Sequence, residues 1–102
     1  MTRGEVWIAE VGRRRRPVLV LTRTEVIDVR ALVTIAEITT SIRGIGAEVL
    51  LDPAAIGLER ESAVNCDGLH TVTQALLKHP VGQLDDTTMQ RVCSALNYAL
   101  GC

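Results

Sequence analysis

The stretch that decides the fold is Arg13-Arg14-Arg15-Arg16-Pro17-Val18-Leu19-Val20-Leu21, where four arginines run directly into a proline and an apolar segment. The apolar residues predict a buried strand from Pro17 to Thr22. Proline is tolerated at the first position of a strand because no ladder hydrogen bond is needed from it there. Dense positive charge at the mouth of such a strand suits phosphate binding better than core packing. A merely solubilising arginine loop is the alternative interpretation.

Further strands are expected on both sides of this stretch. Glu5 to Glu10 predicts a first strand, and the turn Val11 to Arg14 leads from it to the arginines. Trp7, in that first strand, is expected in the core or at a dimer interface. Apolar and β-branched runs bounded by turn residues predict the remaining strands. These are Leu32 to Ile38, Ala47 to Leu51, Ser62 to Cys66, Leu69 to Thr73 and Val81 to Leu84. A tight turn at Asp67-Gly68 is expected between the third and the fourth of these strands.

The C-terminal segment changes period and predicts a helix. Apolar residues recur there at helical spacing, and Thr87 with Gln90 forms a candidate capping box behind two aspartates. Short strands followed by one helix indicate a mainly β fold, a small and strongly bent antiparallel barrel with the helix packed across it. A chain of 102 residues is expected to form a single domain, residues 1–102.

The positive charge is local rather than general. Residues 1–30 hold seven arginines and four acidic residues, whereas the whole chain has a formal net charge of -1. This distribution favours a phosphate-bearing ligand met at one surface over indiscriminate coating of nucleic acid. The three cysteines are far apart and form no CxxC pair, so neither a disulfide framework nor a zinc site is expected. With no secretion signal or membrane segment in the sequence, we expect a cytoplasmic protein without membrane association.

Four segments in order resemble one known family. They are Arg3-Gly4-Glu5-Val6-Trp7, Arg16-Pro17-Val18-Leu19-Val20-Leu21, Ile38-Thr39-Thr40-Ser41 and Val64-Asn65-Cys66-Asp67. In order and spacing this pattern is similar to that of the MazF/PemK toxin endoribonucleases. The resemblance implies an SH3-like barrel that forms a homodimer and cleaves single-stranded RNA at short sequences, with no cofactor or metal. It also implies inhibition of translation and growth, and silencing by a MazE-like antitoxin.

The resemblance implies that Arg16 and Thr39 are catalytic. In metal-independent cleavage the ribose 2′-hydroxyl attacks phosphorus, and negative charge gathers on non-bridging oxygens that fixed donors must stabilise. A guanidinium and a hydroxyl supply such donors. Proton transfer requires another group, for which His70 is a candidate, with an exposed turn residue as its alternative interpretation. Glu37, beside Thr39, could contact RNA.

We expect the remaining RNA contacts from arginines, hydroxyl groups and residues near the predicted turn. These are Arg13, Arg14, Arg15, Thr40, Ser41, Arg43, Asp67 and His70. Asp67 has two interpretations, as an orienter of Arg16 or reader of a base edge, and as the first residue of an Asp-Gly turn, which is favoured.

One segment departs from the family pattern. Many members carry a longer segment between the first two strands, which covers the active site, whereas Val11 to Arg15 is all that separates them here. We expect the arginine cluster to substitute in part for that segment. Two alternatives keep the fold and drop the nuclease: a toxin that poisons DNA gyrase, and a non-catalytic RNA-binding barrel. The scarcity of aromatic residues disfavours the second, because stacking platforms are few.

Overall fold

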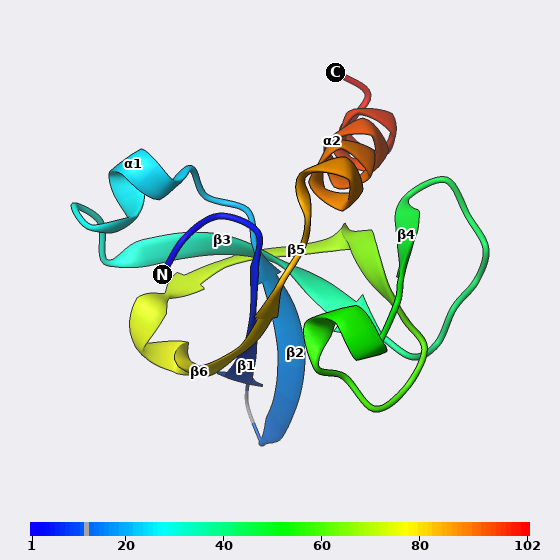
Figure 1. The fold of residues 1–102 in the computed structure, drawn as a ribbon. Coiled ribbons are helices and arrows are strands. Elements are labelled where there is room, and N and C mark those ends of the chain that lie inside the picture. Colours follow the sequence, from blue (N-terminus) through cyan, green and yellow to red (C-terminus); the bar gives the residue numbers. More distant parts are fainter. Residues whose placement is uncertain (12) are drawn as a thin grey trace.

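The computed structural model describes residues 1–11 and 13–102, with side chains for residues 1–10 and 13–102. Figure 1 shows a bent sheet with one long helix against it. The elements in chain order are β1 (Glu5–Val11), β2 (Arg14–Val20), α1 (Thr24–Ile27), β3 (Leu32–Thr39), β4 (Glu48–Leu51), the 3-10 turn η1 (Ala54–Ile56), β5 (Ser62–Thr73), the 3-10 turn η2 (Gln74–Leu76), β6 (Leu77–Gln83) and α2 (Asp86–Leu100).

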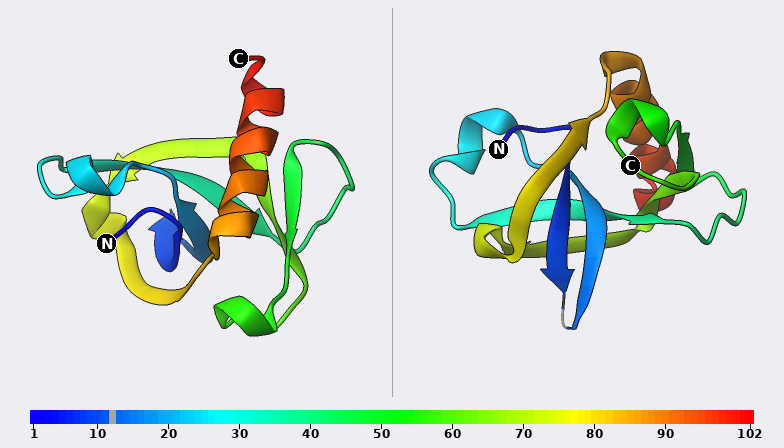
Figure 2. Two further views of the ribbon diagram at one scale, coloured as in Figure 1. Left: turned by 45° about the horizontal axis from the view of Figure 1, so that its top comes forward. Right: turned by 60° about the horizontal axis from the view of Figure 1, so that its bottom comes forward.

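The six strands form one antiparallel sheet in the order β4-β5-β3-β2-β1-β6. The expectation of a mainly β fold with a C-terminal helix is confirmed. Within the described residues the sheet curves like a barrel, but its edge strands β4 and β6 do not pair to close it. Helix α2 packs against β4 and β5, and α1 lies at the opposite end of the sheet (Figure 2). No helix of the described residues has the length and apolarity to cross a bilayer.

Two aliphatic clusters flank the middle of the sheet. The larger includes Leu19 and Val64 and lies on the side of α2, and the smaller includes Val18 and Val20. Because successive side chains of a strand point to opposite faces, β2 is buried on both sides where its apolar run lies. Trp7 is half-buried against the smaller cluster, in agreement with a core role.

The second strand begins earlier than the sequence predicts. It runs from Arg14, not Pro17, because Val11 pairs with Arg14 in the β1–β2 ladder, and it ends at Val20. Gly12, within the predicted turn, lies outside the described residues. Three of the four arginines therefore belong to the strand, which fixes the face to which each side chain points.

The predicted Asp67-Gly68 turn is wrong. β5 is one strand from Ser62 to Thr73, and both of its halves pair with β3. The register shifts between Ala36 and Glu37, so the residues around Asp67 form a bulge on a continuous strand. An Asp-Gly pair also suits such a bulge. The sequence alone does not indicate that both halves of β5 pair with the same strand.

The capping box predicted at Thr87 and Gln90 is also wrong. Helix α2 begins at Asp86, and the N-cap is Asp85, whose Oδ1 accepts a hydrogen bond of 2.7 Å from the backbone N–H of Thr88. Hydrogen bonds with the side chain and with the backbone of Thr88 lower the pKa of the Asp85 carboxyl. The aspartate prevails because a carboxylate is as good an N-cap as a hydroxyl and also favours the positive end of the helix dipole.

Candidate functional site

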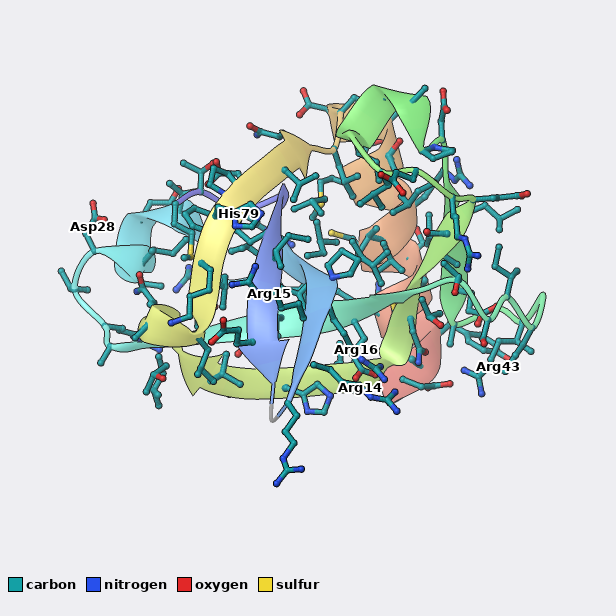
Figure 3. All side chains as sticks on the ribbon, turned by 90° about the horizontal axis from the view of Figure 1, so that it is seen from below. Arg14, Arg15, Arg16, Asp28, Arg43 and His79 are labelled. Carbon is teal, nitrogen blue, oxygen red and sulfur yellow. The ribbon has the colours of Figure 1, made fainter. Side chains whose placement is uncertain are left out.

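The arginines of β2 are divided between the two faces of the sheet. Arg15 lies opposite Glu10 in the β1–β2 ladder, and its Nη2 is 3.3 Å from Glu10 Oε1. Figure 3 shows Arg14 and Arg16 on one side of the hairpin and Arg15 on the other. Arg13, in the turn, is exposed. The side chains of the run are therefore split between two faces, because strand geometry directs that of Arg15 away from those of its two neighbours.

Arg16 and Thr39 are brought together by the pairing of β2 with β3. Val18 is opposite Glu37 in that antiparallel ladder. Arg16, two residues before Val18, and Thr39, two residues after Glu37, therefore lie on the same face of the sheet as that pair. Both line one pocket of about 510 Å³. The pocket is lined by Arg14, Arg15, Arg16, Pro17, Ile38, Thr39, Thr40, Ser41 and Ser62. Most of the predicted arginine and hydroxyl residues therefore meet at one opening.

The Thr39 hydroxyl is oriented by the chain that follows it. Its Oγ1 accepts a hydrogen bond of 3.0 Å from the backbone N–H of Ser41. Because the hydroxyl acts as acceptor in this bond, its own proton is left to donate to a ligand. Thr39 is the last residue of β3, and both Thr40 and Ser41 are exposed beyond it. The end of the strand thus presents one fixed donor and two exposed hydroxyl groups to the pocket.

Glu37 lies at the centre of a group of charges behind the pocket. Its Oε1 is 3.6 Å from Arg16 Nη1 and 3.5 Å from His70 Nε2. The carboxylate therefore orients Arg16, a role that the sequence interpretation considered for Asp67. The sequence suggested Glu37 only as an RNA contact. Its contact with His70 was not expected, because 33 positions separate the two residues along the chain. The β3–β5 register is the signal that would have paired them.

Asp67 is exposed at the bulge of β5. Among the described residues, no hydrogen bond or ion pair joins its side chain to Arg16. Its backbone N–H donates to Asn65 Oδ1 at 3.1 Å. His70 follows on the same strand and reaches the site through Glu37. The structure thus brings His70 into the charge cluster and leaves Asp67 at its rim.

Arg43 is held away from the pocket by a buried carboxylate. Glu48 Oε1 accepts 2.9 Å hydrogen bonds from the backbone N–H groups of Arg43 and Gly44, and Glu48 Oε2 lies 3.3 Å from Arg43 Nε. Burial raises the pKa of the Glu48 carboxyl, but these donors outweigh it and leave the pKa below its ordinary value. Figure 3 places Arg43 on the far loop, remote from Arg14 and Arg16.

Two residues of this network escaped the sequence interpretation. Asn65 Oδ1 accepts from the Asp67 backbone and lies 3.4 Å from Arg43 Nη2, so it links the bulge to the loop. Glu48, the carboxylate that organises the loop, carries no motif that could have singled it out. In residues 1–11 and 13–102, no group of three or more His, Cys, Asp and Glu side chains is placed to hold a metal ion.

Comparison with known proteins identifies the family. The family model of PemK-like, MazF-like toxins of type II toxin-antitoxin systems matches residues 2–100. The chain belongs to the PemK/MazF toxin family. It is 43% identical over 103 residues to the probable endoribonuclease MazF5 of Mycobacterium tuberculosis (strain ATCC 25618 / H37Rv), covering 98% of this chain and 93% of that protein. The family explains why the fold and the four sequence segments occur together.

Solved structures of PemK/MazF toxins have the same fold. The Mycobacterium tuberculosis toxin MazF-mt6 superposes with a TM-score of 0.89 at 35% identity, over 95% of this chain and 96% of that one. An endoribonuclease in complex with its cognate antitoxin, from a mycobacterial species, gives a TM-score of 0.90 at 27% identity, over 99% and 95% of the two chains. The short β1–β2 connection therefore leaves the PemK/MazF fold intact.

Proposed function

We propose that the protein is the toxin of a type II toxin-antitoxin system and acts as a metal-independent, sequence-specific endoribonuclease on single-stranded RNA. The observation that carries this proposal is the meeting of Arg16 and Thr39 at one pocket in a PemK/MazF chain. The names of its relatives, which include a probable endoribonuclease at 43% identity, support the activity. Cleavage of cellular RNA in the cytoplasm would inhibit translation and growth.

The reaction begins with attack of the ribose 2′-hydroxyl on the adjacent phosphorus. The 2′-hydroxyl loses its proton as its oxygen bonds to phosphorus, the bond from phosphorus to the 5′-oxygen breaks, and that oxygen takes up a proton. The products are a 2′,3′-cyclic phosphate, or a 3′-phosphate after hydrolysis, and a 5′-hydroxyl. Negative charge grows on the non-bridging oxygens. Arg16 supplies a planar pair of donors for them, and the Thr39 hydroxyl supplies another. Its hydrogen bond from Ser41 reduces the reorientation that catalysis would require.

Substrate binding is assigned to the groups around this pair. Arg14 lines the pocket with Thr40 and Ser41, while Arg13 in the turn and Arg15, whose side chain points to the other face of the sheet, extend the positive charge around it. Arginines here neutralise neighbouring phosphates, which makes RNA affinity dependent on salt. Arg43, Asp67 and His70 lie outside the pocket lining, so their contacts with RNA would involve nucleotides beyond the scissile phosphate.

Regulation is expected to come from an antitoxin that covers the same positive surface. The relative solved with its cognate antitoxin supports such a partner. An acidic, partly apolar segment that orders on binding would match the arginine-lined pocket. We also propose a homodimer, which the exposed apolar side chains Leu50, Tyr98 and Leu100 of β4 and α2 support.

The test is cleavage of an RNA pool in EDTA, followed by mapping of the new ends. Arg16→Ala and Thr39→Val each remove one donor and should lower the rate about 10²–10³-fold, while the protein remains folded. Arg30→Ala, which removes an exposed arginine before β3, is the matched control and should cleave normally. Intact RNA with wild-type protein, with or without capture of gyrase, would refute the nuclease. Full activity of either pocket variant would remove that residue from the mechanism.

A further inference from the structure

One oxygen of the Glu37 carboxylate lies close to both Arg16 and His70 behind the pocket. Glu37 Oε1 faces Arg16 Nη1 at 3.6 Å and His70 Nε2 at 3.5 Å, and the three side chains come from β3, β2 and β5. Glu37 is 30% exposed, less than either partner, so its charge is partly withdrawn from water. Such a shared carboxylate has a stronger influence on its partners than an exposed ion pair has.

The bulge of β5 makes room for this carboxylate. A Cβ at Gly68 would lie 2.5 Å from Glu37 Oε2, which is closer than real Cβ atoms approach, and at a tight 3.0 Å from Asn65 Nδ2. Gly68 is not among the described glycines with positive φ, so its role is space rather than backbone freedom. The register shift that creates the bulge thus sets both the position of the carboxylate and the direction from which His70 reaches it.

We propose that Glu37 is a positioning residue for RNA cleavage, which holds the Arg16 guanidinium at the pocket and is itself held in place by His70 of β5. The proposal rests on the nuclease function proposed above. Arginine has a long side chain with many rotamers, and a fixed carboxylate behind it restricts them. Arg16 then meets the phosphate already oriented, which lowers the cost of reaching the transition state.

His70 contacts the same carboxylate oxygen from the neighbouring strand. Its Nε2 lies 3.5 Å from Glu37 Oε1, and His70 pairs with Ile35, two residues before Glu37 on β3. The imidazole therefore restricts the positions that the Glu37 carboxylate can adopt, and through that carboxylate it supports the position of Arg16.

The experiment measures kcat and KM for cleavage of one defined RNA by three variants. Glu37→Gln removes the charge and keeps the shape, and we expect kcat to fall about tenfold to 100-fold without a rise in KM. Gly68→Ala keeps every charge but pushes the Glu37 carboxylate aside, so kcat should fall in the same direction. Glu10→Gln, which removes the carboxylate paired with Arg15, is the matched control with kcat unchanged.

A double-mutant cycle separates positioning through Glu37 from a structural role. His70→Asn should lower kcat when Glu37 is present and leave kcat unchanged when both proteins carry Glu37→Gln, because His70 acts through that carboxylate. Thermal unfolding measures whether each variant is folded. If Glu37→Gln does not fold, the kcat of Gly68→Ala is compared with wild type in its place. A kcat for Glu37→Gln within about twofold of wild type, an equal loss in Glu10→Gln, or the same loss from His70→Asn in both backgrounds would overturn the proposal. Each of these results leaves wild-type cleavage intact, whereas inactive wild-type protein would remove the nuclease and this inference together.

Discussion

Replacement of Glu48 by Gln should destabilise the protein through the loop before β4. The carboxylate accepts two backbone hydrogen bonds of 2.9 Å from Arg43 and Gly44 and pairs with Arg43 Nε at 3.3 Å. Its side chain is 2% exposed, so the lost interactions are poorly replaced by water. A glutamine oxygen can still accept from the two N–H groups, but its amide group has only donors to offer to Arg43.

The expected loss is about 2 kcal/mol. A hydrogen bond to a charged group contributes about 1.5–3 kcal/mol and a neutral one about 0.5–1.5 kcal/mol, and the exposed side of Arg43 reduces the ion-pair share. With a urea m-value of about 1–3 kcal/mol per molar for a small domain, the midpoint should fall by about 1 M. Urea unfolding at one fixed protein concentration measures this, because association would otherwise add to the apparent stability. Glu59→Gln, at an exposed carboxylate, is the control.

The pH dependence of the difference checks its cause. The folded-state pKa of Glu48 is below its ordinary value of 4.5, so its stabilising contribution is complete above that pH. It is lost as pH falls through the lowered folded-state value, and the gap between wild type and Glu48→Gln should close there. A gap below about 0.5 kcal/mol at neutral pH, or one that stays constant into the acid range, would refute the reasoning.

Three further predictions concern the scaffold. Gly82→Ala should cost about 1–3 kcal/mol in denaturant unfolding, because its Cβ would lie 2.6 Å from the backbone oxygen of Ile56, and an unchanged midpoint would contradict this. Asp85→Ala should lower the Tm by removing the hydrogen bond to Thr88, and the difference from wild type should persist above pH 3.8 and vanish as pH falls through the lowered folded-state pKa. Burial raises the pKa of Cys66 to about 11, so its alkylation by iodoacetamide at mildly alkaline pH should require unfolding, and rapid labelling of the native protein would show the opposite.

The sequence was sufficient for the parts of the fold that depend on local pattern. The apolar run of β2 and the helical spacing of α2 can each be recognised within a short segment, because a buried strand or helix face requires apolar residues at a characteristic spacing. Helix α1 was missed because its four residues are too few to show a helical spacing of apolar residues. The arginines were placed before β2 rather than in it, since arginine has no strong strand preference and its partners in β1 decide the pairing.

The candidate site shows the same division. Arg16 and Thr39 could be selected from motif resemblance, and the structure adds that they share a pocket. Glu37 gained its place from the register of β3 against β2 and β5, a relation between segments that no window of sequence contains. Asp67 was given a turn because Asp-Gly usually forms one, and a shared partner strand overrode that preference.

The bulge in β5 has a consequence for how this scaffold can diversify. Both halves of the strand remain anchored on β3, so the excursion around Gly68 can change in length or residue type without loss of the flanking ladder. Replacement there would reshape the environment of Arg16, for which we propose a catalytic role, at little expense to folding. The molecule thus separates what keeps it folded from what tunes its chemistry, and selection can act on the second while the first stays constant.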